Sequence, residues 1–293
     1  MLAESEQITN EPYQNSKLVR PLVKWVGGKR QLMSDLRREM PSSFEAYYEP
    51  FIGGAALLMS LQPQKAFISD MNRELVNLYR IVKNEPDALI SALNNHRNEE
   101  EYFYEVRAQD RDPDLWLSLS NVDKAARLIF LNRTCFNGLY RVNNSGEFNA
   151  PYGHYKNPRI VDPVTINAVS QYFQRNEVTI LEGDFQASIT SAEHGDFVYF
   201  DPPYDPVSSS ANFTGYSRGG FDRSEQERLR DTAKHLADKG VNVLLSNSST
   251  EFIRDVYSDP VFRIVNVKAR RAVNSVGADR GEVDEVLIRT YKK

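Results

Sequence analysis

The stretch Asp196-Phe197-Val198-Tyr199-Phe200-Asp201-Pro202-Pro203-Tyr204 predicts a buried strand that stops abruptly. Phe197 to Phe200 is a continuous run of aromatic and β-branched residues, which is typical of a strand buried on both faces of a parallel sheet. Because proline cannot donate to a sheet ladder, the strand must end at Asp201. In open α/β sheets ligands bind at the carboxyl ends of the strands, so we expect a site at Asp201.

The residues that end this strand suit the binding of an aromatic amine. Asp201 offers carboxylate oxygens, and the backbone carbonyls of Asp201 and Pro202 add acceptors whose direction the prolines hold. Tyr204 offers a flat face for stacking. Acceptors beside such a face suit a ring with an exocyclic NH2 group, such as adenine, and would aim the nitrogen lone pair at an electrophile. An ordinary strand-ending turn is the alternative, since Asp-Pro pairs commonly initiate turns.

The composition of the chain bounds its class. The 293 residues are enough for one large domain or for one domain with an insertion, and 41% hydrophobic with 26% charged residues is a globular composition. The net charge of −4 argues mildly against a nucleic-acid partner, but only as a whole-chain average, because local basic clusters can still form a binding surface. The single cysteine, Cys135, rules out an internal disulfide framework, and the four histidines lack metal-ligand spacing, so we expect no metal.

The chain shows no signal for a membrane or for secretion. No apolar run approaches the ~20 residues of a membrane span. Residues 1–16 are polar and without periodicity, which predicts a disordered tail rather than a signal peptide. We therefore expect a cytoplasmic protein with no membrane partner.

Two glycine pairs precede helix-like segments early in the chain. Gly27-Gly28 allows a tight turn before a helix over 31–40, and with Lys29 this turn suits a carboxylate or a phosphate. It is not a Walker loop, because Gly-x4-Gly-Lys-Ser/Thr is absent. Tyr47 to Leu61 reads as a strand, a turn at Gly53-Gly54 and a helix, as in the first unit of a nucleotide-binding sheet. The full Gly-x-Gly-x-x-Gly fingerprint is missing, which disfavours a dinucleotide dehydrogenase.

Acids end the next two predicted strands. Asp70 follows the Gly53-Gly54 turn at roughly the spacing at which a second-strand acid binds ribose hydroxyls, and a helix cap is the alternative. Asp184 and Phe185 follow the strand that begins at Val178. They could hold an adenine ring by a hydrogen bond and an edge contact, and a capping turn is equally open.

From Asn72 to about Thr165 the apolar pattern becomes helical. Helical periodicity runs over 74–82, 87–93, 100–107 and 122–131. A segment this long exceeds a crossover connection and indicates an inserted, mostly helical subdomain. It ends near Asn137-Gly138, a strong hairpin-turn signal flanked by an aromatic residue, arginine and amides. Such residues read base edges or wedge between bases, whereas a polar hairpin with a half-buried Phe136 is the alternative.

The last third of the chain completes the predicted sheet. We expect a helix at 224–239 with a capping box of Ser224 and Glu227, a strand at 241–245, and an antiparallel pair at 261–267 and 285–291. The Ser- and Gly-rich segment 208–221 predicts a mobile loop over the site, and 268–281 predicts either a DNA-facing loop or a surface hairpin.

The order of these motifs resembles a known enzyme family. The motifs are Lys24-Trp25-x-Gly27-Gly28-Lys29, Glu49-Pro50-Phe51-x-Gly53-Gly54, Asp70, Asn137-Gly138-Leu139-Tyr140-Arg141 and Asp201-Pro202-Pro203-Tyr204. Together they resemble the Dam-type, α-class DNA adenine-N6 methyltransferases, from about Leu18 to the C-terminus. The resemblance looks closest to the GATC-modifying members, including the methylase of the pneumococcal GATC restriction system. Each motif alone is weak, but the ordered set is specific.

The resemblance implies a fold and a division of the chain. We expect an α/β fold: a Rossmann-like methyltransferase sheet with helices on both faces and an inserted, mostly helical DNA-recognition domain. Residues 17–72 and 166–293 would form the catalytic domain that binds S-adenosylmethionine, and residues 73–165 the target-recognition domain.

The resemblance also implies roles for individual residues. The catalytic residues would be Asp201, Pro202 and Tyr204, where Asp201 and Pro202 accept from the target amine and Tyr204 stacks on the flipped base. The cofactor would be bound by Trp25, Gly28, Lys29, Glu49, Phe51, Gly53, Asp70, Asp184, Phe185 and Asp201. The DNA would be contacted by Lys24, Phe136, Asn137, Leu139, Arg141 and Pro151, with Phe136 as the wedge.

The predicted function is therefore transfer of a methyl group from S-adenosylmethionine to N6 of adenine in double-stranded DNA, within GATC. An adenine methyltransferase acting on RNA, a protein-glutamine methyltransferase and a non-enzymatic DNA-binding regulator are the alternatives. The large hairpin-bearing insert favours duplex DNA, and a regulator would not need Asp201 beside a cofactor pocket. We expect a monomer associated with the nucleoid, with a cognate restriction endonuclease as a further candidate partner.

Overall fold

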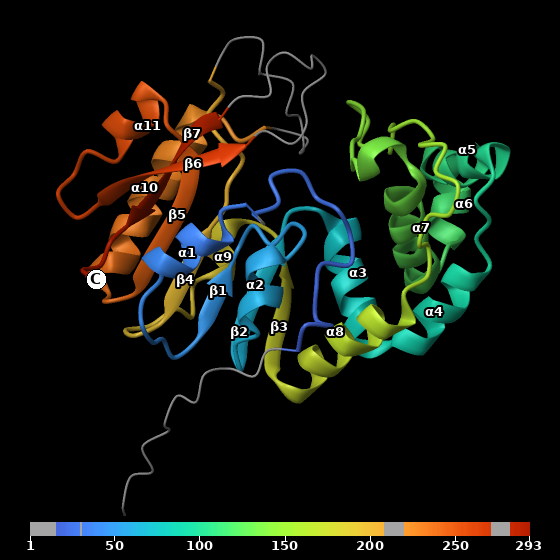
Figure 1. Ribbon diagram of the computed structural model, residues 1–293, viewed down its shortest axis with the longest axis horizontal. Helices are drawn as coiled ribbons and strands as arrows, with labels where there is room; N and C mark the ends of the chain where they lie inside the picture. The colour runs from blue at the N-terminus through green and yellow to red at the C-terminus, as the bar shows by residue number, and fades with distance from the viewer. Residues whose placement is uncertain (1–15, 30, 208–219, 271–281) are drawn as a thin grey trace, which may run out of the picture.

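The computed structural model describes residues 16–29, 31–207, 220–270 and 282–293, and these form one seven-stranded sheet with helices around it (Figure 1). The strands are β1 (Tyr47–Glu49), β2 (Lys65–Asp70), β3 (Glu177–Glu182), β4 (Phe197–Phe200), β5 (Asn242–Ser248), β6 (Arg263–Arg270) and β7 (Glu282–Arg289). Their order across the sheet is β3-β2-β1-β4-β5-β7-β6. The strands from β3 to β5 pair in parallel, and β7 is antiparallel to both β5 and β6.

The strand order reverses between β1 and β4. From β1 the chain moves outward to β2 and β3, and it then returns to place β4 on the other side of β1. Tyr47 pairs with Phe197 and Tyr48 with Val198 in parallel, so the carboxyl ends of both strands lie at the same end of the sheet. A crevice at such a reversal is the usual ligand site of open α/β sheets. All four residues of β4 are fully buried, which confirms the predicted central strand.

Helices cover both faces of the sheet, as predicted. Tyr47 and Tyr199 share one hydrophobic cluster with α1 (Met33–Glu39), α2 (Ala56–Leu61), α3 (Arg73–Asn84) and α8 (Pro163–Arg175). Tyr48 and Phe200 share the second cluster with α9 (Phe185–Ser188), α10 (Arg223–Asp238) and α11 (Glu251–Val256). Alternate strand residues therefore point into opposite layers, as the period of a strand requires.

A group of helices lies between β2 and β3 in the sequence and beyond the β3 edge in space (Figure 1). After α3 come α4 (Pro86–Asn94), α5 (Glu100–Ala108), the 3-10 turn η1 (Gln109–Arg111), α6 (Pro113–Ser118), α7 (Asn121–Thr134) and the 3-10 turn η2 (Phe136–Gly138). The helices predicted here are present, and α6 is an addition that Asp112 caps and Pro113 begins. The apolar cluster of the sheet continues into α5 and α7 through Phe103 and Phe130.

Two local predictions need correction. Asn137-Gly138 was expected to form a hairpin turn between two strands. Asn137 instead takes a left-handed conformation (φ 58°) inside η2. The chain on either side forms only the isolated bridges Cys135–Tyr152 and Val142–Phe148. Asparagine adopts the left-handed conformation readily, so a turn at this position was correctly predicted. The predicted hairpin is wrong, because the flanking segments do not pair as two strands. Helix α10 begins at Arg223 rather than at Ser224. The Asp222 carboxylate accepts from the Glu225 N–H and caps it, which replaces the predicted capping box.

Several predicted features fall outside the described residues. These are nearly all of the tail 1–16, and most of the loops 208–221 and 268–281. The closing antiparallel pair is present as β6 and β7. In the part of the chain that is described, no helix combines the length and the apolar character needed to cross a membrane.

Candidate active site

The carboxylate of Asp201 lies at the reversal point, directly after β4. The Lys29 ammonium is 2.7 Å from Asp201 Oδ1, and Ser246 Oγ on β5 donates to the same oxygen at 2.8 Å. Lys29 Nζ also donates to the Gly27 carbonyl at 2.7 Å. The Asp201 side chain keeps 20% of its surface exposed, so part of the carboxylate remains accessible to solvent. We call Lys29, Asp201, Tyr204 and Ser246 the strand-end site.

Tyr204 extends this site with an aromatic face. Its ring centroid lies 4.7 Å from Lys29 Nζ, and its hydroxyl donates to Glu285 Oε2 on β7 at 3.0 Å. A ring anchored at its hydroxyl presents a fixed face. The structure therefore brings Lys29 of the first glycine motif together with Asp201 and Tyr204 of the motif that ends β4.

Burial and the neighbouring charges act in opposite directions on the pKa values of Asp201 and Lys29. Burial raises the pKa of Asp201, while the Lys29 charge and the Ser246 hydrogen bond oppose that rise. Burial lowers the pKa of Lys29, but the nearby charges of Asp201 and Glu285 outweigh it and leave that pKa raised. Lys29 is therefore held protonated and paired with Asp201.

A buried polar network holds the loop that carries Pro202 and Pro203. Gln226 on α10 donates to the Pro203 carbonyl at 2.8 Å and accepts from Asn247 Nδ2 at 2.9 Å. Asn247 Oδ1 accepts from the Asp205 N–H at 3.1 Å. Gln226 and Asn247 are almost completely buried, so these bonds persist out of water. Gln226 and Asn247 are not among the site residues predicted from the sequence, where the polar run Ser246-Asn247-Ser248 at a strand end was the only signal for Asn247.

Glu49, at the end of β1, is a buried acid beside the strand-end site. Its Oε2 accepts from the Tyr47 hydroxyl at 2.8 Å and from the Leu58 N–H at 3.2 Å. Burial raises the pKa of Glu49 to about 8, with the charge of Asp201 adding to the rise. The Glu49 carboxyl therefore keeps its proton to a higher pH in the folded protein than a free carboxyl does.

The Gly53-Gly54 turn is closed by Asp70 and Trp25. Asp70 Oδ2 accepts from the Gly53 N–H at 3.1 Å, and its Oδ1 accepts from the Asn72 N–H at 2.9 Å. A Cβ at Gly53 would lie 3.0 Å from Trp25 Cδ1, and one at Gly54 would lie 3.2 Å from Trp25 Cβ. Glycine is needed here because the indole packs directly on the turn. Burial raises the pKa of Asp70, and these backbone N–H groups oppose the rise.

The first glycine turn lies beside the same indole. The Gly28 N–H donates to the Trp25 carbonyl at 3.3 Å, and Gly27 has a φ of 79°, which glycine adopts freely. This turn places Lys29 in the strand-end site, so the two glycine pairs and Asp201 border one region.

Asp184 and Phe185 lie on the other face, at the start of α9. Asp184 caps α9 through the Gln186 N–H and forms a bidentate ion pair with Arg228 of α10, at 3.0 and 2.7 Å. The Arg228 guanidinium also lies 4.2 Å from the centroid of the Phe185 ring, and Phe51 packs on that ring at 5.5 Å. Arg228 holds the pKa of Asp184 below its usual range. The cap foreseen as the alternative is present, and Arg228 was missed because it lies on a distant helix.

The six predicted DNA-binding residues lie on neighbouring loops, on and around the segment 136–141, which we call the recognition turn. The Phe136 N–H donates to the Pro151 carbonyl at 2.8 Å, and a Cβ at Gly138 would lie 2.5 Å from Lys24 Cδ. Arg141 donates to the side-chain and backbone oxygens of Asn149, at 2.7 and 3.1 Å. Exposed side chains are Lys24, Phe136, Asn137, Arg141 and Pro151, and Leu139 is half-buried.

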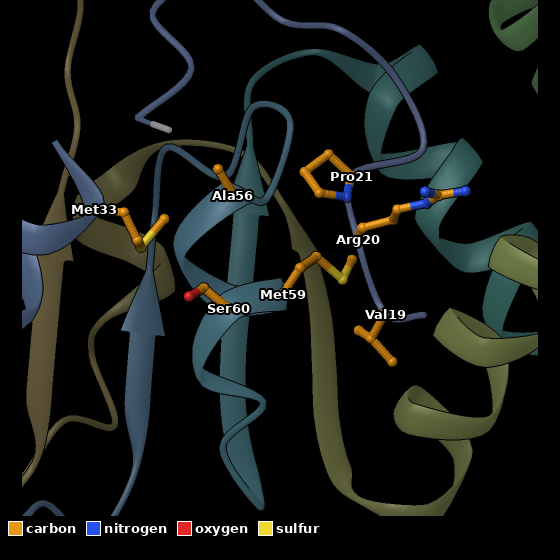
Figure 2. Close-up of a pocket in the computed structure, with 7 residues that line it drawn as sticks. All are labelled: Val19, Arg20, Pro21, Met33, Ala56, Met59 and Ser60. Atoms are coloured by element: carbon orange, nitrogen blue, oxygen red, sulfur yellow. The ribbon is translucent and has the colours of Figure 1, made fainter. Parts of the chain in front are cut away.

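A separate apolar pocket lies between the N-terminal segment and helices α1 and α2 (Figure 2). Its lining is Val19, Arg20, Pro21, Met33, Ala56, Met59 and Ser60. None of these is a predicted catalytic, cofactor or DNA residue, so this pocket is not the candidate site. Across the described ranges, no group of three or more His, Cys, Asp or Glu side chains is arranged to hold a metal ion.

Comparison with known proteins decides the family. A model of the D12 class N6 adenine-specific DNA methyltransferases matches residues 25–273. The chain belongs to this family. The match covers both glycine turns, the recognition turn and the strand-end site, so the predicted family of adenine methyltransferases is confirmed.

Relatives of this methyltransferase cover nearly its whole length. The type II methyltransferase M1.LlaDCHI of Lactococcus lactis subsp. cremoris is 46% identical over 275 residues, which are 93% of this chain and 96% of the relative. The type II methyltransferase M.MjaIII of Methanocaldococcus jannaschii is 38% identical over 93% of this chain and 99% of its own length. The DNA adenine methylase of Escherichia coli K12 is 32% identical over 92% of this chain and 94% of its own length. The enzyme is thus an adenine-specific DNA methyltransferase, and its expected nearness to the pneumococcal methylase stays a prediction.

Proposed function

We propose that this methyltransferase transfers a methyl group from S-adenosylmethionine to N6 of adenine within GATC in duplex DNA. The observation that carries the proposal is the position of Asp201 and Tyr204 at the reversal point between β1 and β4, beside both glycine turns. This is where an open α/β sheet binds its ligands.

The residues around the glycine turns fit the proposed cofactor. When bound, S-adenosylmethionine supplies a methyl group activated on a sulfonium. Its amino-acid end suits the buried acid Glu49 and the turn that carries Gly28 and Lys29. Asp70 suits the ribose hydroxyls, and Asp184 with the aromatic residues Phe51 and Phe185 suits the adenine. Gly53 has a positive φ, and a Cβ there would lie 3.0 Å from Trp25 Cδ1, so a side chain at this position would strain the turn that is proposed to meet the cofactor.

The strand-end site suits acceptance of an amine. Asp201 and the Pro202 carbonyl would accept the two N–H bonds of the target N6 and stabilise the positive charge that develops on it. Tyr204 would stack on the extruded base, which offsets part of the few kcal/mol that base flipping costs. Lys29 and Ser246 both contact Asp201 Oδ1 and oppose the rise in pKa that burial causes, so they would favour the ionised carboxylate and fix its direction.

The recognition turn supports the proposed sequence preference. Arg141 is exposed and would donate to a guanine. Phe136, exposed by 56%, would act as the wedge, and Leu139 with Pro151 would offer apolar contacts. We further propose that residues 73–165 act as the target-recognition domain. A restriction endonuclease partner is proposed because two of the relatives carry type II methyltransferase names.

Methyl incorporation with a labelled cofactor tests the proposal. Tritiated S-adenosylmethionine is incubated with the enzyme and with duplexes that differ by one base pair of GATC, and the product nucleoside is identified after digestion. We expect label in N6-methyladenine from the GATC duplex alone. Equal labelling of all duplexes would refute the sequence preference, and labelling of RNA in place of DNA would refute the substrate.

A further inference from the structure

One buried amide joins the start of the chain to the recognition turn. On α7, Asn132 Oδ1 accepts from the Lys24 N–H at 2.8 Å, and Asn132 Nδ2 donates to the Lys24 carbonyl at 2.8 Å. The same Nδ2 donates to the Gly138 carbonyl at 3.1 Å. Asn132 is only 1% exposed; its bond to Gly138 is buried and its two bonds to Lys24 are partly buried. Losing them would leave the Gly138 carbonyl unpaired out of water and would release the Lys24 backbone.

Tyr140 makes a second connection between the same two regions. Its neighbours Leu139 and Arg141 face partly or fully outward, whereas Tyr140 is only 4% exposed. Its ring stacks on Trp25 with the centroids 4.6 Å apart and an angle of 22° between the planes. The Tyr140 hydroxyl also interacts with Glu74 and Asn72 at the start of α3. The ring is therefore held between the indole that covers the Gly53 turn and the helices that follow β2.

These two contacts fix Lys24 against the recognition turn. Gly138 has a φ of 64°, and the Lys24 side chain lies so close that a Cβ there would be 2.5 Å from Lys24 Cδ. Lys24 lies just before the first glycine turn. Arg141 follows α7 and lies more than a hundred residues later in the chain. Two base contacts from such distant segments need a common rigid support, because hydrogen-bond geometry tolerates only about 0.5 Å of error.

We infer that Asn132 and Tyr140 are positioning residues for base recognition. They hold Lys24 in register with Leu139 and Arg141, and through Trp25 they tie this reading surface to the cofactor turn. This inference rests on the proposed function, because it assigns Lys24 and Arg141 to the bases of the target site. Because Tyr140 packs on Trp25, a substitution that removes the Tyr140 ring should also weaken cofactor binding. Binding of the cofactor and binding of the target DNA should then strengthen each other by the same factor.

Four variants test the inference. Asn132→Leu removes the three hydrogen bonds at similar volume, and Tyr140→Leu removes the stack. Tyr140→Phe keeps the stack and serves as the conservative rescue. Thr134→Val is the matched control, because Thr134 is fully buried on the same helix and its hydroxyl donates only to the Phe130 carbonyl within α7.

Three quantities are measured on each folded variant. The discrimination ratio is kcat/KM on the GATC duplex divided by kcat/KM on a duplex with one altered base pair. The other two are the Kd for S-adenosylmethionine, by calorimetry without DNA, and Tm. We expect Asn132→Leu and Tyr140→Leu to lower the ratio about tenfold, the size of one lost base contact. Tyr140→Leu also raises the Kd several-fold, whereas Tyr140→Phe and Thr134→Val retain both values.

An equal loss of activity on cognate and altered duplexes would overturn the inference, because a merely structural role weakens both alike. If Asn132→Leu does not fold, the contrast between Tyr140→Leu and Tyr140→Phe decides, and equal ratios for those two variants reject it. Failure of the proposed function shows separately, because the wild-type enzyme itself would then methylate no duplex or show no preference.

Discussion

The strand-end site and the recognition turn differ in how they hold their working groups. In the strand-end site the groups are themselves enclosed: the Lys29 side chain is 8% exposed and the Asp201 side chain 20%, and each bonds its neighbours directly. Around the recognition turn the side chains proposed to contact DNA are exposed, except for the half-buried Leu139, and the buried residues Asn132 and Tyr140 lie behind them. Enclosed groups act through electrostatics, which burial strengthens, whereas exposed groups act through their position. Substitutions in the first region should therefore change rate, and those in the second should change selectivity.

The largest effect is expected at Asp201. Asp201→Asn keeps the size of the side chain but removes its charge, so it loses the stabilisation of the developing positive charge. We expect the rate of methyl transfer in a single turnover to fall about 10² to 10³-fold. Asp222→Asn is the matched control, because Asp222 caps α10 and asparagine caps equally well. A transfer rate within about threefold of wild type would remove Asp201 from the mechanism and erase the contrast between the two regions.

The next effect concerns pH and Glu49. Its pKa in the folded protein is raised to about 8 from 4.5, chiefly by burial, so between these values the folded state binds the proton more tightly than the unfolded state does. This contribution to the free energy of unfolding is complete below about pH 4.5 and is lost as the pH rises through about 8. We expect stability to fall by on the order of a few kcal/mol over that window, and Glu49→Gln to remove most of this slope. Denaturant unfolding at several pH values measures it, and an unchanged slope in the variant contradicts the assignment.

A smaller and different effect is expected at Arg141. Arg141→Ala should lower discrimination at one base pair by about 10 to 100-fold while the calorimetric Kd for the cofactor is unchanged. Arg175→Ala is the control. This exposed arginine ends α8 directly before β3 begins, so it lies at the amino ends of the strands, whereas Asp201 lies at a carboxyl end. It removes the same charge without a base contact. Equal relaxation at every base pair would mean that Arg141 contacts phosphate rather than a base.

The smallest effect is expected at Arg228, the partner of Asp184. The ion pair is half-exposed, so its loss in Arg228→Gln should cost only about 1 kcal/mol of stability. The freed Asp184 and Phe185 would change cofactor affinity by about tenfold or less, with discrimination between duplexes unaffected. Calorimetry and thermal unfolding measure both quantities. Altered discrimination would show that Asp184 and the recognition turn are coupled.

The sequence by itself determined the sheet strand at 197–200, the position of Asp201 at its end, the two glycine turns and the helical segment after Asp70. These features follow from local rules, because strand burial, proline and glycine act within a few residues. The tertiary structure decided which groups meet. Asn132 bonds Lys24 across 108 residues, Arg228 pairs with Asp184 across 44, and Ser246 reaches Asp201 across 45. Such contacts depend on strand order and on helix placement, which set neighbours in space that no local pattern encodes.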